Sequence, residues 1–338
     1  MPTPFHLGYR MPAEWEPHAA TWLSWPHNLE TWPGKFDPVP AVFAQLVGHL
    51  QEPVHILVTG EAMAQEVQSL LQAQGAWRAD IQLHPIVTND CWARDHGPIF
   101  ITRPGELALV DWGFNSWGGK YGPWDDDDQV PTQVADLLGL PRFSPGIILE
   151  GGSIDVNGQG LALTTEQCLL NRNRNPHLTR TDLEQYLRDY LGVEQVLWLG
   201  EGIVGDDTDG HIDDLARFVN PTTVVCVLEE DPADENYALL QANYERLLRL
   251  AGDPGLTVHA LPMPSAHYYD GVRLPASYAN FYIANGVVLV PVFGDPQDAI
   301  ALATLQKLFP NRKVMGIYCT DLVWGLGALH CVTQQQPR

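Results

Sequence analysis

Stretches of alternating apolar and polar residues recur along the chain, and each is followed by a helix-like stretch and then by an apolar run. In the clearest copy, residues 153–165 alternate as a hairpin would, around the turn-forming pair Asn157-Gly158. Residues 179–192 then place apolar side chains at helical spacing, and residues 193–200 form the apolar run of a buried strand. The pattern predicts a strand-strand-helix-strand unit.

The same unit is predicted about five times. Two regular copies occupy residues 217–263 and 278–319, and another occupies residues 99–149 and ends on the strand-like run 146–149. The first copy, residues 53–86, is less regular and follows an irregular segment rich in tryptophan. Repeats of roughly 55 to 65 residues indicate a propeller or an array.

Such units predict an α/β fold in which five small sheets surround an axis, with helices outside and a central cavity. This is a five-bladed α/β propeller, an arrangement that protects strand edges. The competing architecture is a doubly wound α/β sheet. Frequent hairpins favour the propeller, because parallel crossovers do not need them.

The charge of the chain narrows the classes of partner. Its 41 Asp and Glu outnumber its 19 Lys and Arg, for a formal net charge of −22. Without a basic patch to neutralise phosphates, we expect no nucleic acid partner, whereas a field of this sign attracts a small cation. Because there is neither a signal-peptide core nor a run of roughly 18 apolar residues, we expect a soluble, cytoplasmic protein with no membrane partner.

The cysteine count points to thiol chemistry. Five cysteines without any Cys-x-x-Cys pair argue against a disulfide framework and against a zinc ribbon. Cys331 is the candidate for a reactive thiol, because it follows the turn Gly325-x-Gly327. The others are expected to be structural, since a lone cysteine is usually a small buried hydrophobe. These structural cysteines are Cys91, Cys168, Cys226 and Cys319.

Polar residues follow the last strand of each predicted unit, where the loops of a closed ring would converge on one cavity. Such loops carry Glu150, His211, Asp213 and Cys331. A further loop of this kind carries Asp90, Trp92, Arg94 and Asp95. A thiol needs a partner to become a thiolate near neutral pH. His330 adjoins Cys331, but neighbours in an extended segment point to opposite faces, which favours His211 as the base.

Three other patterns do not indicate a cofactor. Residues 200–205, GEGIVG, match a dinucleotide loop, but the acidic DDTDGHIDD stretch that follows would repel a pyrophosphate. The same stretch lacks both anchoring acids of a calcium loop. His211 and Asp213 could hold a metal, but no second histidine or cysteine pair has suitable spacing, so neither metal nor cofactor is expected.

Seven motifs in one order connect the chain to a known family. They are ARDHGP, NSWGGKYGPWDDDD, LEGGSIDVNGQG, TTEQCLLNRNRNP, GDDTDGHIDD, ASYANFYIANG and LHCVTQQQP. From residue 11 to the C-terminus the sequence resembles the agmatine deiminases, part of the bacterial-type peptidyl-arginine deiminase family in the guanidine-modifying, or pentein, superfamily. The resemblance implies a five-bladed pentein fold, a single domain over residues 1–338, and a homodimer.

The resemblance also implies a reaction, the hydrolysis of agmatine to N-carbamoylputrescine and ammonia through a thiouronium intermediate. The expected site residues are Cys331 as nucleophile, His211 as general acid and base, Asp95, Asp213 and Glu150 as the remaining active-site acids, and Trp92 and Trp117 along the channel for the substrate tail. We expect Asp95 and Asp213 to grip the guanidinium and Glu150 to orient His211.

Because the sequence departs from the family pattern at four positions, it does not fix the identity of the substrate tail. Leu326 and Ala328 stand where glycines are frequent, His96 where threonine is common, and Asp155 where histidine is frequent. The alternatives are a deiminase of free or peptidyl arginine, an amidinotransferase, a non-catalytic pentein binding module and a Cys-His-Asp amide hydrolase. A binding module would have lost the cysteine or the acids, and an amide hydrolase would not need several acids around the thiol.

Overall fold

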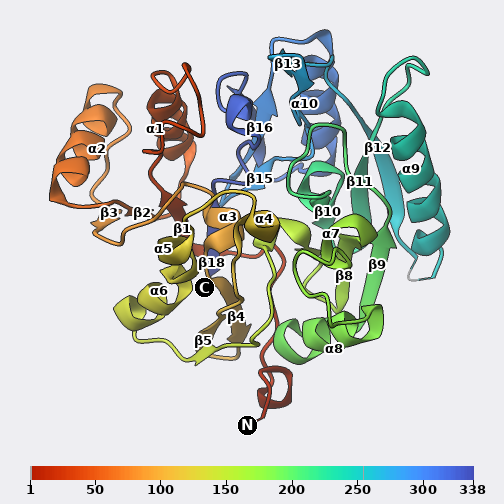
Figure 1. The fold of residues 1–338 in the computed structure, drawn as a ribbon, viewed down its shortest axis with the longest axis horizontal. Helices are drawn as coiled ribbons and strands as arrows, with labels where there is room; N and C mark the ends of the chain where they lie inside the picture. Colours follow the sequence, from red (N-terminus) through yellow and green to blue (C-terminus); the bar gives the residue numbers. More distant parts are fainter. Residues whose placement is uncertain (1, 254) are drawn as a thin grey trace.

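The chain folds as a ring of small sheets with its long helices on the outside, in a computed structural model that describes residues 2–253 and 255–338 (Figure 1). The strands are β1 (His18–Ser24), β2 (Val54–Leu57), β3 (Ile81–His84), β4 (Ile99–Arg103), β5 (Glu106–Val110), β6 (Arg142–Phe143), β7 (Asp155–Val156), β8 (Leu161–Thr165), β9 (Gln195–Leu199), β10 (Ala216–Asn220), β11 (Thr223–Leu228), β12 (Thr257–Pro262), β13 (Tyr268–Tyr269), β14 (Val272–Arg273), β15 (Tyr282–Ile283), β16 (Val287–Val292), β17 (Lys313–Tyr318) and β18 (Gln334–Pro337). The α-helices are α1 (Val39–His49), α2 (Glu61–Ala73), α3 (Ala93–His96), α4 (Ser116–Gly119), α5 (Asp125–Asp128), α6 (Val130–Leu138), α7 (Glu166–Leu169), α8 (Arg180–Leu191), α9 (Tyr237–Ala251) and α10 (Pro296–Leu308). Short 3₁₀ helices are η1 (Phe5–Leu7), η2 (Gly151–Ser153), η3 (Ile212–Asp214) and η4 (Val323–Gly325).

Four sheets share one topology. In each, the first two strands are antiparallel and the third runs parallel to the second; the sheets are β4-β5-β6, β7-β8-β9, β10-β11-β12 and β15-β16-β17. A helix on the outside of the ring connects the two parallel strands, namely α6, α8, α9 and α10 in turn (Figure 1). The predicted strand-strand-helix-strand unit and the propeller-like α/β fold are therefore confirmed. A small extra hairpin, β13-β14, lies between the last two units.

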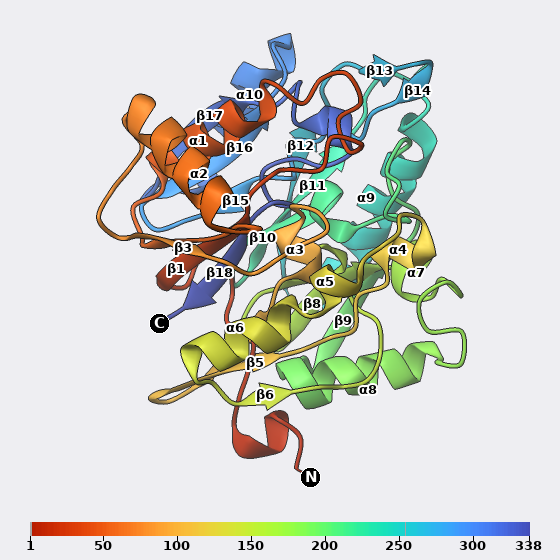
Figure 2. The same ribbon diagram turned by 60° about the vertical axis from the view of Figure 1, so that its left-hand side comes forward.

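The fifth sheet is built from both ends of the chain. Strand β18 pairs antiparallel with β1, and β1 runs parallel to β2, which runs parallel to β3 (Figure 2). The C-terminal strand thus supplies the position that a hairpin supplies in the other sheets. This pairing holds the C-terminal segment in the sheet, because a terminus that is hydrogen-bonded to a strand does not fray.

One strand prediction was wrong. Residues 146–149 were expected to close the sheet of β4 and β5, but the third strand is β6, and Ile148 makes only an isolated bridge to Gly113. The physical reason is Gly146, whose φ of 76° lies in the left-handed region and interrupts an extended run. The chain beyond this turn continues into Glu150 and η2.

Local signals set the ends of the outer helices. Thr179 caps α8 through reciprocal hydrogen bonds with Asp182, and the helix ends at Gly192, whose φ is 74°. Its buried residues recur every fourth position and form one apolar stripe; they are Leu183, Leu187 and Leu191. None of the helices in the described ranges is both long and apolar enough for a membrane span.

Candidate functional site

Cys331 lies on the loop that joins η4 to β18. Its side chain is 6% exposed, and its backbone carbonyl accepts a hydrogen bond from the Arg94 N–H at 3.1 Å. The Arg94 side chain braces the same loop, since it donates to the carbonyl of His330 at 3.3 Å and to Gln335 Oε1 at 2.8 Å. The thiol is therefore held in place by α3 on one side and by β18 on the other.

Asp95 lies on the short helix α3, which follows the loop 85–92 after β3. Its Oδ1 accepts a hydrogen bond from the Gly152 N–H at 2.9 Å, and its Oδ2 accepts one from the Trp117 indole at 3.0 Å. These two donors come from η2 and α4, so three separate loops fix the orientation of one carboxylate.

Four of the expected residues meet around Gly152. The Cys331 sulfur lies 3.8 Å from Asp213 Oδ2, and His211 Nδ1 lies 3.7 Å from Asp95 Oδ1. A Cβ added to Gly152 would lie 2.6 Å from His211 Nδ1, 2.7 Å from Asp95 Oδ1 and 3.0 Å from Asp213 Oδ2. Gly152 therefore has no room for a side chain, and two carboxylates and an imidazole pack directly against its backbone.

Glu150 lies next to this group, close to His211. It is fully buried, and its Oε1 accepts a hydrogen bond from Arg174 Nε at 2.8 Å. Glu150, Cys168 and His211 each offer a polar atom within 4.8 Å of the other two. Within residues 2–253 and 255–338 this is the one cluster with a metal-like ligand set. Because Glu150 is already ion-paired with Arg174, the cluster does not by itself indicate a metal.

Burial disfavours a negative charge on Asp95 and on Cys331. Burial raises the pKa of Asp95 to about 6, and the nearby Asp213 adds to this shift. Burial also raises the pKa of the Cys331 thiol, and the carboxylate of Asp213 raises it further. For His211 burial acts against the imidazolium, but Asp95, Cys168 and Asp213 together outweigh it and raise the pKa well above the ordinary value. A bound cation would favour the ionised acids and the thiolate.

Several buried polar atoms of the site have no hydrogen-bond partner among the described residues. They are both ring nitrogens of His211, Oδ1 of Asp213 and Oε2 of Glu150. Unpaired buried polar groups are rare in folded proteins unless a ligand or water completes them. This group combines two carboxylates, an imidazole and a thiol. Such a set suits a flat cation with several N–H donors.

The sequence prediction missed His330 and Asn280 as members of this group. His330 was set aside as the base, but its ring lies between Asp213 Oδ2, 2.7 Å from Nδ1, and Glu14 Oε2, 2.8 Å from Nε2. Although burial opposes it, this contact holds the pKa of Asp213 below its ordinary value. Asn280 donates to the Cys331 sulfur at 3.0 Å. Its place in the ASYANFYIANG motif was the signal that could have found it.

The two tryptophans occupy different positions. Trp92 is buried, stacks at a tilt on Trp32 with 5.7 Å between ring centres, and would lie 2.4 Å from a Cβ on Gly327. Trp92 thus supports the loop of the thiol. Trp117 is partly exposed and donates to Asp95, in a left-handed backbone conformation with a φ of 54°. Trp117 therefore borders the carboxylate itself.

The remaining sequence candidates and departures lie outside the group. Asp90 accepts hydrogen bonds from Thr31 and from the Cys91 N–H. His96 is buried, which lowers its pKa to about 3, and Asp155 is paired with Arg217. Beside the thiol, Leu326 adopts a φ of 70° that costs a non-glycine residue about 1–2 kcal/mol.

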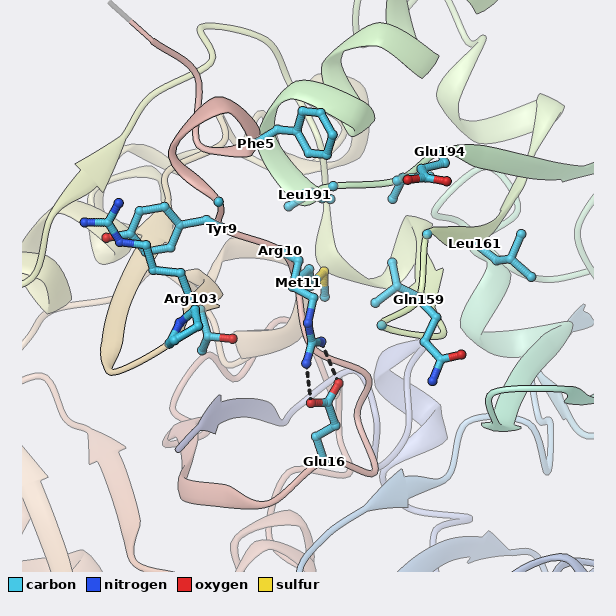
Figure 3. Close-up of a pocket in the computed structure, with 18 of the residues that line it drawn as sticks. Phe5, Tyr9, Arg10, Met11, Glu16, Arg103, Gln159, Leu161, Leu191 and Glu194 are labelled. Carbon is cyan, nitrogen blue, oxygen red and sulfur yellow. Dashed lines mark hydrogen bonds and ion pairs between the residues drawn. The ribbon is translucent and has the colours of Figure 1, made fainter.

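A hollow with a volume of about 590 Å³ lies away from these residues. It is lined by η1, by the β4–β5 and β7–β8 turns and by the end of α8 (Figure 3). Arg10 and Glu16, which line it, are paired with each other at 2.7 Å (Figure 3). Because none of the expected site residues lines this hollow, the buried group around Gly152 is the better candidate for chemistry.

Comparisons with known proteins agree with this choice. The family model of the Porphyromonas-type peptidyl-arginine deiminases matches residues 10–337. Agmatine deiminases of Ectopseudomonas mendocina (strain ymp) and Pseudomonas aeruginosa (strain LESB58) are each 40% identical, over 99% of this chain and 97% of theirs. A solved agmatine deiminase of Enterococcus faecalis superposes with a TM-score of 0.92 at 36% identity, covering 100% of this chain and 98% of its own. A Cys-to-Ser variant of the C. jejuni agmatine deiminase, solved with substrate bound, gives 0.89 at 32% identity over 98% of this chain and 96% of its own.

Proposed function

Because this chain belongs to the Porphyromonas-type peptidyl-arginine deiminase family, we propose that it hydrolyses agmatine to N-carbamoylputrescine and ammonia. Relatives named agmatine deiminase match almost the whole chain at about 40% identity, which supports this activity. The observation that carries the proposal is the convergence of a thiol, an imidazole and two carboxylates around Gly152. That set fits the cleavage of a carbon–nitrogen bond in a guanidinium.

Asp95 and Asp213 are the proposed ligands of the guanidinium. Carboxylates recognise this planar cation through paired, charge-assisted hydrogen bonds, and Oδ1 of Asp213 has no partner in the described part of the chain. One oxygen of each carboxylate packs against the backbone of Gly152. The cation would bind between the two carboxylates with its carbon facing the sulfur of Cys331.

Cys331 is the proposed nucleophile and His211 the proposed acid and base. As the cation binds, the thiol proton leaves to solvent and the thiolate adds to the guanidinium carbon. Protonated His211 gives its proton to a terminal nitrogen, the carbon–nitrogen bond breaks, and ammonia leaves behind a thiouronium on the sulfur. His211 then takes a proton from water, hydroxide adds to the carbon, and the carbon–sulfur bond breaks to release the ureido product and the thiol.

The charges around the site favour a substrate without a carboxylate. Arginine differs from agmatine by its α-carboxylate, which would need a cationic partner. The basic side chains near the site are already paired. Arg174 binds Glu150 and Asp209, Lys120 binds Asp207 and Asp209, and Arg94 binds Glu14 and Gln335.

We therefore expect agmatine to be the best substrate in a direct comparison. Ammonia release by the purified protein would be measured on agmatine, free arginine and a peptide with a C-terminal arginine. We expect kcat/KM for either arginine substrate to be at least roughly 100-fold lower, because an unpaired buried carboxylate costs a few kcal/mol. Equal or faster turnover of arginine would contradict the assignment of agmatine as the substrate. Transfer of the amidino group to a labelled amine would indicate an amidinotransferase instead.

We expect kcat/KM to fall in acid with a midpoint near pH 6. Asp95 binds a cation only as a carboxylate, and burial raises its pKa to about 6. Below that pH the rate should fall by about tenfold per unit, since kcat/KM reports the free enzyme. The folded state binds this proton more tightly than the unfolded chain, so the group adds stability below its unfolded pKa and loses it as pH rises through 6. A rate that stays constant down to pH 4.5, with the fold intact by circular dichroism, would contradict the role of Asp95.

Other expectations stay predictions. We propose that residues 1–338 act as one domain and that turnover needs neither metal nor cofactor, so that dialysis against a chelator should leave the rate unchanged. A homodimer is predicted and can be tested by the mass of the protein in solution, and a cytoplasmic location by fractionation of cells.

A further inference from the structure

We propose that Asn280 is a further catalytic residue, whose side-chain amide holds the sulfur of Cys331 and stabilises its thiolate. Asn280 lies in the loop before β15 and is completely buried. Its Nδ2 donates to Cys331 Sγ at 3.0 Å and to Asp214 Oδ1 at 3.0 Å. The proposal rests on the proposed function insofar as Cys331 is the nucleophile.

The backbone of the thiol loop fixes the orientation of this amide. Oδ1 of Asn280 accepts a hydrogen bond from the His330 N–H at 2.9 Å and a longer one from the Cys331 N–H at 3.4 Å. An amide NH₂ group cannot accept hydrogen bonds, so the flipped orientation would leave the Cys331 N–H without this partner and the His330 N–H with only its 3.2 Å bond to the backbone carbonyl of Asn280. The NH₂ group must therefore face the sulfur. One side chain thus positions both the backbone and the sulfur of the nucleophile.

The surroundings of the sulfur explain why it needs such a donor. Besides Asn280, the sulfur has a contact with Asp213 Oδ2 at 3.8 Å, and a carboxylate can only accept a proton from a thiol or repel a thiolate. Burial and nearby carboxylates raise the pKa of the thiol. Hydrogen bonds to the charged form act in the opposite direction. Asn280 supplies one such hydrogen bond to the sulfur of Cys331.

An uncharged donor is the appropriate residue at this position. A lysine or arginine beside the sulfur would stabilise the thiolate more strongly, but it would also repel the guanidinium that must reach the same sulfur. The second N–H of Asn280 is held by Asp214, whose pKa burial and the neighbouring Asp213 raise. A protonated Asp214 still accepts this hydrogen bond and adds no negative charge next to the thiolate.

The test is the pH dependence of Cys331 alkylation by iodoacetamide, followed by the mass of the peptide that carries Cys331. Asn280→Ala should move the midpoint of alkylation up by about one to two pH units and lower kcat about 10- to 100-fold with KM little changed. Asn280→Asp keeps the acceptor oxygen but replaces the donor with an anionic group, so its midpoint should rise further. Asn157→Ala is the matched control, because Asn157 is also a buried asparagine but binds the backbone of Gln159, Leu161 and Pro221.

A purely structural role for Asn280 would give a different result. If Asn280→Ala lowers the melting temperature as Asn157→Ala does but leaves the alkylation midpoint at the wild-type value, the proposal is wrong. The alkylation profile does not depend on the substrate. Should the wild-type protein fail to release ammonia from agmatine, the proposed function would fail while the role of Asn280 at the thiol could still be decided.

Discussion

Replacing Cys331 by alanine is expected to abolish the release of ammonia from agmatine. The variant keeps the carboxylates and the imidazole but has no atom that can form the covalent intermediate, so kcat should fall by at least roughly 10⁴-fold. The residue is small and its loop is held by Arg94 and by β18, so the fold should remain. Agmatine should still bind, and calorimetry on the variant would detect it.

Cys226→Ala is the matched control for this experiment. Cys226 is completely buried in β11, where burial raises its pKa to about 12, and it contacts none of the proposed site residues through a hydrogen bond in the described structure. Its alanine variant should retain nearly full activity. Undiminished turnover by Cys331→Ala would show that another group attacks the substrate.

Gly152→Ala is expected to have the second largest effect, a loss of at least roughly 100-fold in kcat/KM. The added methyl group would lie 2.6 Å from His211 Nδ1 and 2.7 Å from Asp95 Oδ1, distances at which the side chains must move apart. Displacements of about 1 Å in an active site cost roughly this factor in rate.

Gly60→Ala separates this effect from a general sensitivity to alanine. Gly60 caps α2, and a Cβ there meets nothing within 4 Å. The rate and the melting temperature of this variant should stay close to wild type. If Gly152→Ala retained wild-type kcat/KM, the close packing of His211 and Asp95 against Gly152 could not be required for the reaction.

The repeated units were predictable from the sequence because their signals are local. Alternation, turn residues and the Thr179 and Gly192 caps define β7, β8 and α8 without reference to the rest of the chain. The closure of the ring was not predictable in this way. Strand β18 has the polar sequence Gln-Gln-Gln-Pro and becomes a strand only because β1, more than 300 residues earlier, offers it an edge.

The site was predictable only in part. Cys331, His211, Asp95 and Asp213 follow the last strands of their units, so their convergence could be expected from the ring. The residues that hold these four side chains in place could not be predicted in the same way. His330 was judged by its neighbour Cys331 in the sequence, whereas its partners, Asp213 and Glu14, come from other loops.

Glu150 illustrates the same limit. It was expected to orient His211, and the structure brings it close to that ring, but its hydrogen bond is with Arg174. Contacts between loops that are distant in the sequence depend on the packing of the whole ring. Spacing along the chain predicts which loops meet, and not which side chains pair within them.

The measurement that tests the central claim most directly is a rapid acid quench of the enzyme during turnover of agmatine, followed by mass spectrometry of its peptides. The account predicts that the peptide carrying Cys331 gains the mass of agmatine minus ammonia, and that this adduct disappears when the substrate is exhausted. Turnover without any adduct on Cys331, or with the adduct on another cysteine such as Cys168, would contradict it.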